Sequence, residues 1–308
     1  MITYFYRSVR EEKLAQIDRF RTGTWIHSEA PTPKDLEVLT TKFNLDLDLL
    51  TDALDPDEIP RIELEDDILY VYMRSATRQG NQVSTSPVLI AVGPKFVASV
   101  SRTRIADFDR FIDRAELFTT QRAKLLLQIM RHLIATYEQN VTFLTRQIRG
   151  VRSRLDVATV NNRDFIQFVI IEDALNYFLS ELVPTNLLLT SLLSGRHALS
   201  FYEDDRDLIE DLIQTTRQLT ETSRGALKTI VNIREAYSNI LTNNLNRQVQ
   251  LLTSLTVVLT IPTIVFSLYG MNVPLPGQVS HAAFPLIVGG TAAACVLILY
   301  ILYRRRWL

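Results

Sequence analysis

Apolar and polar residues follow three different patterns along the chain, and each pattern predicts a different kind of structure. Up to about residue 114, short β-branched or aromatic runs lie between turn residues, which is typical of strands. The clearest runs are ITYFY (2–6), ILYVYMR (68–74), VLIAV (88–92) and KFVASVS (95–101). Residues 32–44 and 47–54 instead have helical spacing, and the first begins with a Thr-Pro helix start. We therefore expect a mixed α/β domain over residues 1–114.

From about Ala115 onward, apolar residues recur every three or four positions with charges between them. This is the pattern of an amphipathic helix, and residues 123–155 show it most clearly. A second segment of the same kind runs from about Asn162 to Ser194, with Pro184 as an expected kink. These segments predict a region of long antiparallel helices over residues 115–203.

A third helix is expected to begin near Asp204. No proline follows before Pro262, and no glycine lies between Gly225 and Gly270. We therefore predict one continuous helix of about 65 residues, near 100 Å long at 1.5 Å per residue. It belongs to a segment, residues 204–273, that is expected to combine a stalk helix with a first membrane span.

Charge is distributed unevenly, although the net charge of the whole chain is only −1. From Gln248 to Tyr303 the sequence has no Asp, Glu, Lys or Arg. Two apolar stretches in this segment approach the roughly 20 residues that a spanning helix needs. They predict a first span over about 249–269, an outer loop over 274–281, a second span over 282–303 and a basic tail over 304–308.

Basic residues flank the two spans on the same side. Arg247 precedes the first span and residues 304–306 are all arginine, so both chain ends are expected in the cytoplasm. Tyr300, Tyr303 and Trp307 fit an interfacial aromatic belt. The N-terminus has no long apolar run, so no cleavable signal peptide is expected. The predicted location is the cell (inner or plasma) membrane, with the bilayer as a partner and no nucleic acid.

Small hydroxyl residues follow one face of the first span. We call them the hydroxyl stripe: Thr253, Thr256, Thr260, Thr263 and Ser267, separated by three, four, three and four residues. Stepping back along this face gives Val249 and Asn246. Such hydroxyls commonly bond to their own helix or allow close packing, but five in register favour a hydrated wall of a pore. Two spans cannot enclose a pore, so this interpretation requires a homo-oligomer.

The turn after the first span contains Tyr269, Gly270, Met271 and Asn272. They stand in the stretch SLYGMN, with IPT at residues 261–263 before it, and the second span ends in YRRRWL. On these residues the chain resembles the CorA family of magnesium transporters, whose signature is Tyr-Gly-Met-Asn between two C-terminal spans. The resemblance covers the whole chain. It implies an α+β cytoplasmic domain, long helices, a stalk helix that continues into the first span, and a two-helix transmembrane hairpin, assembled as a funnel-shaped homopentamer.

The resemblance also implies roles for particular residues. The first span of each subunit would line the pore, which agrees with the stripe. Asn272 would present its side-chain carbonyl in a ring at the outer mouth, in a turn shaped by Gly270 and Met271. Neutral amide oxygens suit Mg²⁺, because this ion dehydrates reluctantly and because conduction needs weak binding. Asn246 would repeat the ring at the inner end.

A regulatory site for intracellular Mg²⁺ is a further implication of the family. In LTDALDPDEIPR the matching residue is Asp52, and its expected partner on the stalk helix of the next subunit is Asp211, with Asp207 one turn away. Two carboxylates across an interface repel each other unless a cation lies between them. The alternative is that Asp52 caps a turn and Asp211 lies on a solvated face, and the sequence does not decide between the two for Asp211.

Two features depart from the family pattern. The loop VPLPGQVSHAA has no carboxylate where many members have one, and His281 is its only titratable side chain. Thr260 stands where an apolar pore residue is common. The apolar constriction is therefore expected at Val249 and Leu252, nearer the cytoplasm.

The expected function is a divalent-cation channel or transporter, with Mg²⁺ as cargo and regulator and with Co²⁺ and Ni²⁺ as further candidate ions. A zinc or other transition-metal transporter, with or without proton coupling, is the nearest alternative. Softer metals favour His and Cys, but Cys295 is the single cysteine and the histidines are scattered at positions 27, 132, 197 and 281. A membrane-anchored signalling or scaffold protein is a more distant alternative. The sequence has no Walker loop, His-Glu-x-x-His or Cys cluster, so an enzyme is not expected.

Overall fold

The computed structural model describes residues 2–113, 117–154, 162–195, 199–273, 275, 277 and 281–305. These residues belong to two compact units, Met1–Val231 and Asn232–Leu308. The domain boundary expected between residues 114 and 115 lies outside the described residues, as do Trp307 and most of the expected outer loop.

The first unit contains a seven-stranded sheet in the order β2-β1-β3-β7-β6-β5-β4. Only the β3–β7 pair is parallel among these strands. The strands are β1 (Ile2–Tyr6), β2 (Ala15–Ile17), β3 (Thr24–Glu29), β4 (Arg61–Glu65), β5 (Ile68–Gln79), β6 (Gln82–Val92) and β7 (Phe96–Ser101). The four strands expected from the sequence are all present, and β5 and β6 extend beyond the expected runs into one long hairpin.

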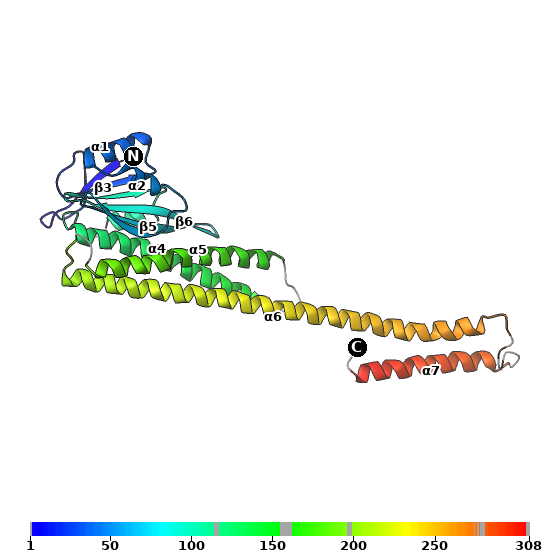
Figure 1. The fold of residues 1–308 in the computed structure, drawn as a ribbon. Coiled ribbons are helices and arrows are strands. Elements are labelled where there is room, and N and C mark those ends of the chain that lie inside the picture. Colours follow the sequence, from blue (N-terminus) through cyan, green and yellow to red (C-terminus); the bar gives the residue numbers. More distant parts are fainter. Residues whose placement is uncertain are drawn as a thin grey trace. The chain divides into compact units, whose positions relative to one another are not determined.

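Helices cover both faces of this sheet (Figure 1). On one face lie α1 (Pro33–Phe43) and α2 (Leu47–Asp52), whose apolar residues share a core with Tyr70, Tyr72 and Leu89 of the sheet. The expected Thr-Pro start of α1 is observed as a capping box, in which Thr32 and Asp35 bond to each other's backbone N–H. The short helix α3 (Phe108–Ile112) follows β7. The position of α2 matters most for function, because Asp52 is its last residue.

Two long helices, α4 (Arg122–Arg154) and α5 (Asn162–Leu193), lie beyond the other face of the sheet (Figure 1). A buried polar network joins them to the sheet. Glu181 of α5 accepts hydrogen bonds from Thr85 of β6 at 2.6 Å and from the Tyr137 hydroxyl of α4 at 2.7 Å. It also forms an ion pair with Arg74 of β5 at 2.7 Å. Both carboxylate oxygens of Glu181 thus have partners, which offsets the cost of removing the ion pair from water.

The helix α6 runs without interruption from Glu203 to Tyr269, a length of 67 residues. This confirms the continuous helix that the sequence predicts. In the first unit, Asn186 of α5 donates to the carbonyl of Ile213 at 2.8 Å and to the Thr216 hydroxyl at 2.7 Å. The N-terminal part of α6 is therefore attached to α5 by polar contacts.

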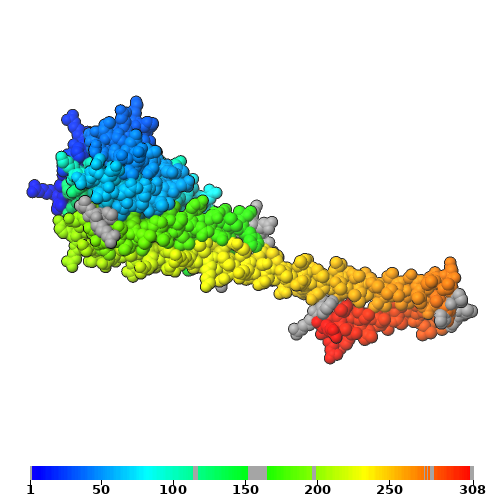
Figure 2. Space-filling view, in the orientation of Figure 1, coloured from blue at the N-terminus to red at the C-terminus, as the bar shows by residue number. Residues whose placement is uncertain are grey.

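In the second unit, α7 (Ala283–Arg304) lies beside the C-terminal part of α6 (Figures 1 and 2). Both helices are long and apolar enough to cross a membrane, and only 6% of each apolar window is buried in the single chain. Side chains that face outward here are therefore available to lipid or to other copies of the chain.

Candidate ion pathway and regulatory site

Helix α7 covers one side of the first span and leaves the hydroxyl stripe uncovered. Ser254 is buried, Val258 and Val265 are partly buried, and the thiol of Cys295 in α7 lies 3.7 Å from the Val258 carbonyl oxygen. All five stripe residues are exposed. At about 100° per residue, the face that carries the stripe is nearly opposite to the face that α7 covers. The stripe is thus free for contact with water or with another copy of the chain.

The threonine hydroxyls of the stripe bond to their own helix. Thr256 donates to the Leu252 carbonyl at 2.8 Å, Thr260 to Thr256 at 2.7 Å and Thr263 to Leu259 at 2.9 Å. These bonds satisfy the hydroxyl protons but leave the oxygen lone pairs facing outward as acceptors. Such acceptors are compatible with a pathway for a hydrated cation, since its water shell presents hydrogen-bond donors.

The helix ends at the motif that the sequence singles out. The backbone N–H of Gly270 bonds to the Phe266 carbonyl at 2.9 Å, and that of Met271 bonds to the Leu268 carbonyl at 3.3 Å. A Cβ atom at position 270 would lie 3.2 Å from the Phe266 carbonyl oxygen, closer than an ordinary contact. Glycine therefore allows the chain to leave the helix tightly, so that Met271 and Asn272 follow at once.

Asn272 lies on the surface of the single chain. Its side chain is exposed and makes no hydrogen bond to any of the described residues. Met271 and Tyr269 beside it are also exposed, at 52% and 37%. An amide that packs no core and serves no internal bond is available for an ion or for another subunit.

The inner end of the expected pathway is exposed as well. Asn246, Val249 and Leu252 all face outward from α6. Leu252 also borders an apolar groove of about 590 Å³ between α6 and α7, which Leu251, Leu255 and Leu299 help to line. The single chain therefore contains the residues of the expected constriction without forming it.

The structure places Asp52 in a cluster that the sequence did not reveal. The Asp52 side chain is 48% exposed, and its Oδ2 atom lies 2.8 Å from Nη2 of Arg61 on β4. Arg61 also contacts Glu63, with Nε 2.5 Å from Oε1, and Glu58. Its guanidinium stacks 4.0 Å above the ring of Tyr72. The only sign of this cluster in the sequence is a Pro-Arg pair after an acidic helix end, and that pair does not specify the contacts of Arg61.

Asp211 and Asp207 are both exposed on α6. The backbone carbonyl of Asp211 accepts the Thr215 hydroxyl at 2.8 Å, and no ion pair among the described residues involves its carboxylate. No hydrogen bond or ion pair in the described part of the single chain joins Asp211 to Asp52. The structure thus leaves the expected partner carboxylates separately exposed.

No cluster of three or more His, Cys, Asp or Glu residues that could hold a metal ion occurs among the described residues. His27 is buried and its Nδ1 atom lies 2.8 Å from the Ser99 hydroxyl, while His132 Nε2 lies 2.8 Å from the Ala106 carbonyl oxygen. His281 is exposed and His197 lies outside the described residues. His27 and His132 therefore each have a polar partner within the first unit.

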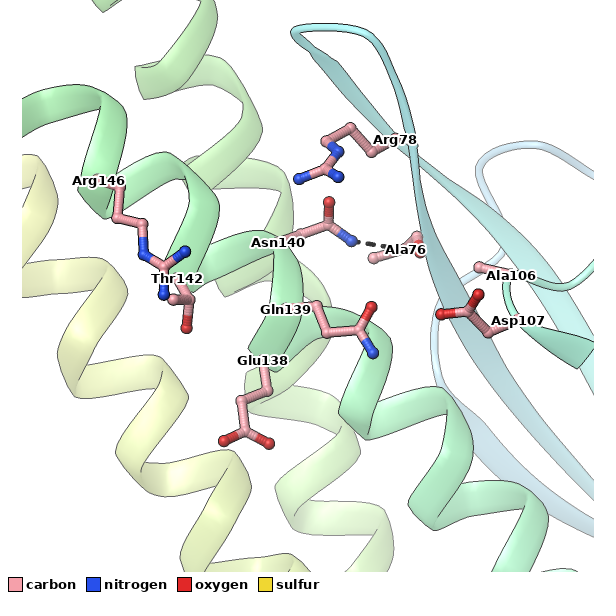
Figure 3. Close-up of a pocket in the computed structure, with 9 residues that line it drawn as sticks. All are labelled: Ala76, Arg78, Ala106, Asp107, Glu138, Gln139, Asn140, Thr142 and Arg146. Carbon is pink, nitrogen blue, oxygen red and sulfur yellow. Dashed lines mark hydrogen bonds between the residues drawn. The ribbon is translucent and has the colours of Figure 1, made fainter. Parts of the chain in front are cut away.

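A cleft of about 580 Å³ lies between β5, α4 and the turn before α3 (Figure 3). Arg78 and Arg146 border it together with Asp107 and Glu138, so its formal charges cancel. The buried Asn140 amide lies at its wall and donates to the carbonyls of Thr136 at 2.7 Å and Ala76 at 3.4 Å. The cleft contains none of the residues expected to bind or conduct a cation.

Comparison with known proteins relates the chain to one family of transporters. A family model described as CorA-like Mg²⁺ transporter protein matches residues 21–305. A curated relative, the cobalt/magnesium transport protein CorA of Methanocaldococcus jannaschii, is 24% identical over 316 residues, which is 98% of this chain and 96% of that protein.

Two solved structures share the fold. The complete CorA magnesium transporter of M. jannaschii superposes with a TM-score of 0.88 at 20% identity and covers 100% of this chain and 99% of its own. A ZntB cytoplasmic domain from Vibrio parahaemolyticus superposes with a TM-score of 0.63 at 12% identity, over 78% of this chain and 98% of its own. The full-length match confirms the expected architecture of an α+β domain, a long helix and two apolar C-terminal helices.

Proposed function

We propose, because the chain belongs to the CorA-like Mg²⁺ transporter family, that it carries Mg²⁺ across the cell membrane through a pore formed by several copies of its first span. The observation that supports this most directly is the hydroxyl stripe, which is exposed on the face of α6 opposite to α7. A homopentamer with both chain ends in the cytoplasm gives the stripe a hydrated interior to face. The family consists of transporters, which agrees with the expectation that the chain is not an enzyme.

Each part of the first span has a role in this pathway. A ring of Asn272 amides at the outer mouth holds the hydrated ion through its water shell, in the turn that Tyr269, Gly270 and Met271 form. Below it, the stripe hydroxyls offer acceptor oxygens to the same waters. Val249 and Leu252 form the apolar constriction near the cytoplasm, and Asn246 forms a second amide ring beyond it. Neutral oxygens bind weakly enough for the ion to leave, as conduction requires.

Closure of this pathway rests on Asp52 and Asp211 of neighbouring subunits. In the single chain Asp211 is exposed and Asp52 is about half exposed, and carboxylate oxygens are the ligands that Mg²⁺ takes from proteins while keeping several of its waters. A divalent cation bound there supplies the positive charge that allows two carboxylates to lie close together. Asp207, one turn from Asp211, adds negative charge to the same surface. When the cation is absent, repulsion between Asp52 and Asp211 favours separation of the subunits.

Ion flux into liposomes tests the proposed function. The purified full-length protein is reconstituted, and uptake of Mg²⁺, Co²⁺, Ni²⁺ and Zn²⁺ is compared with and without a proton gradient. We expect Mg²⁺ uptake that follows the membrane potential and does not require the proton gradient. Uptake of Zn²⁺ in preference to Mg²⁺, or uptake that stops without the gradient, would instead support a transition-metal or proton-coupled transporter of the same fold.

A further inference from the structure

One guanidinium lies among three carboxylates at the proposed regulatory site. Arg61 contacts Asp52 at 2.8 Å, Glu63 at 2.5 Å, and Glu58. Its five N–H donors suit this arrangement, because a guanidinium can bond to several carboxylates at the same time. Asp52 is therefore not a bare carboxylate in the single chain, because a cation that belongs to the protein contacts it, although the cluster of one guanidinium and three carboxylates remains net negative.

Arg61 is held firmly in this position. The Tyr72 ring supports the guanidinium at 4.0 Å, and the Arg61 side chain is only 27% exposed. Glu58 is anchored in turn, because its backbone carbonyl accepts a 2.7 Å hydrogen bond from Arg74, a residue that is itself buried. These contacts do not involve Asp52, so Arg61 stays beside Asp52 whatever else binds that carboxylate.

A divalent ion bound to the outer side of Asp52 would therefore lie a few ångströms from a fixed positive charge. At about 6 Å in water the repulsion between +2 and +1 charges lowers affinity about tenfold, and physiological salt reduces this effect to roughly threefold. Because Asp52 is half exposed, these aqueous values are the appropriate ones. The site is weakened by this amount without losing either carboxylate.

We infer that the fixed positive charge of Arg61 weakens binding of the regulatory divalent cation at Asp52 and so sets the concentration at which the pathway closes. The inference rests on the proposed function, in which Asp52 forms one half of the sensor. Its physical consequence is a weak site that empties when intracellular Mg²⁺ falls.

Protection of α6 against trypsin measures the site independently of transport. The full-length protein in detergent is digested over a series of Mg²⁺ concentrations, and the midpoint of protection is compared between variants. Arg61→Gln removes the charge, whereas Arg61→Lys keeps it. Arg102→Gln is the matched control, because exposed Arg102 donates to the Leu54 carbonyl at 2.8 Å near the same turn but forms no ion pair with a described residue.

We expect Arg61→Gln to lower the Mg²⁺ midpoint by roughly three- to tenfold. Arg61→Lys and Arg102→Gln should remain within twofold of the wild type. If Arg61→Lys has a normal melting temperature and assembly size, the cluster tolerates a change in the shape of this side chain. The comparison of Arg61→Lys with the wild type then remains valid even if Arg61→Gln is less stable.

The variant Asp52→Asn distinguishes two outcomes: either Arg61 does not affect the regulatory site, or Asp52 is not part of that site. If Asp52→Asn abolishes protection while Arg61→Gln leaves the midpoint unchanged or raises it, Arg61 is only a structural residue and the inference is overturned. If Asp52→Asn keeps wild-type protection, the sensor lies elsewhere, and the regulatory part of the proposed function fails together with the inference.

Discussion

At the residue scale, the exposed amide of Asn272 is the group that we propose selects the ion. It follows a helix end where a Cβ atom at position 270 would lie 3.2 Å from the Phe266 carbonyl oxygen, and its own side chain is exposed. A role outside the single chain explains both its exposure and its place in the motif.

Replacement of Asn272 by Ala should therefore abolish Mg²⁺ flux while expression and assembly remain normal. Asn272→Asp should retain binding but slow release, because a ring of carboxylates holds a divalent cation more strongly than a ring of amides. Flux assays in liposomes, with assembly checked by size-exclusion chromatography, measure both effects. Wild-type flux and selectivity in both variants would show that the motif serves only as a turn between the two spans.

A second residue gives a pH dependence to the stability of the first unit. Burial lowers the pKa of His27 below its usual 6.5, although Glu29, with Oε1 3.4 Å from Nε2, opposes the change. The folded state then binds the proton less readily than the unfolded state. The contribution of neutral His27 to the stability of the first unit is complete above pH 6.5 and is lost as pH falls through the folded-state pKa.

Between pH 7 and pH 5 the melting temperature of the wild type should fall more than that of His27→Gln, which does not titrate. A pKa that differs by one between the folded and unfolded states changes the free energy of unfolding by about 1.4 kcal/mol. In a domain the size of the first unit, this lowers the melting temperature by roughly 3–6 °C. Exposed His281→Gln is the control and should behave like the wild type. An identical pH response in His27→Gln and the wild type would show that other groups cause the acid sensitivity.

At the element scale, the buried pair Arg74–Glu181 attaches α5 to the sheet. Both side chains are almost fully buried, and Glu181 also bonds to Thr85 and Tyr137. Burial raises the pKa of Glu181, opposed by these hydrogen bonds and by Arg74. The segment before β4 is tied to the same pair, because Arg74 also donates to the Glu58 carbonyl.

Glu181→Gln should destabilise the first unit by about 3–5 kcal/mol, because it leaves the Arg74 charge buried without a counter-charge. Glu138→Gln on α4 removes an equal but exposed charge and should have little effect. Denaturant titration of both variants provides the comparison. A loss below about 1 kcal/mol for Glu181→Gln would mean that water or a rearranged network replaces the ion pair.

The helices were easier to predict from the sequence than the strands. Periodic apolar residues without breakers predicted α6 over nearly its full length, because helical spacing is a local property. Strands β2 and β4 were not predicted, since β2 has three residues and β4 is a charged edge strand, RIELE. Strand β3, TWIHSE, was missed because its polar residues are buried by neighbours distant in sequence.

The candidate site shows the same limit. Motif and spacing identified the hydroxyl stripe and Asn272, because these residues share one helix and the turn that follows it. They did not identify Arg61 as the partner of Asp52, because that contact depends on how the end of α2 meets the edge strand β4. Although the two residues are close in sequence, the spacing alone does not fix the path of the turn between them, and that path brings the two side chains together.

At the scale of the whole molecule, the single chain is incomplete as a transporter. Its stripe, the Asn272 amide and Asp211 are exposed and Asp52 is about half exposed, and in the proposed homo-oligomer each of them acts together with another copy of the chain. Membership of the CorA-like Mg²⁺ transporter family supports this proposal. Regulation and conduction are therefore properties of the proposed assembly.

The double change Asp52→Asn, Asp211→Asn tests regulation at this scale. It should weaken Mg²⁺ protection of α6 against protease and raise flux at millimolar internal Mg²⁺, since the cation no longer stabilises the closed arrangement. Coupled sites typically contribute about 1–3 kcal/mol each, so five of them can shift the balance by several kcal/mol. Wild-type protection and inhibition in the double variant would place the sensor elsewhere.

In the proposed assembly the exposed face of α6 lines the path of the ion, so a thiol reagent attached to that face should block the path. Cys295, the only native cysteine, is first replaced by Ala. Single cysteines are then placed at Thr256 and Thr263 on the stripe and at Val258 and Val265 on the side covered by α7. Mg²⁺ flux into liposomes is measured before and after a charged, water-soluble thiol reagent is added.

We expect the reagent to label Thr256→Cys and Thr263→Cys and to block their flux, because a positively charged adduct in the path repels Mg²⁺. Val258→Cys and Val265→Cys should remain unlabelled and should conduct as before. Equal labelling and equal block of both pairs, or block of the valine pair alone, would show that the stripe does not line the path of the ion.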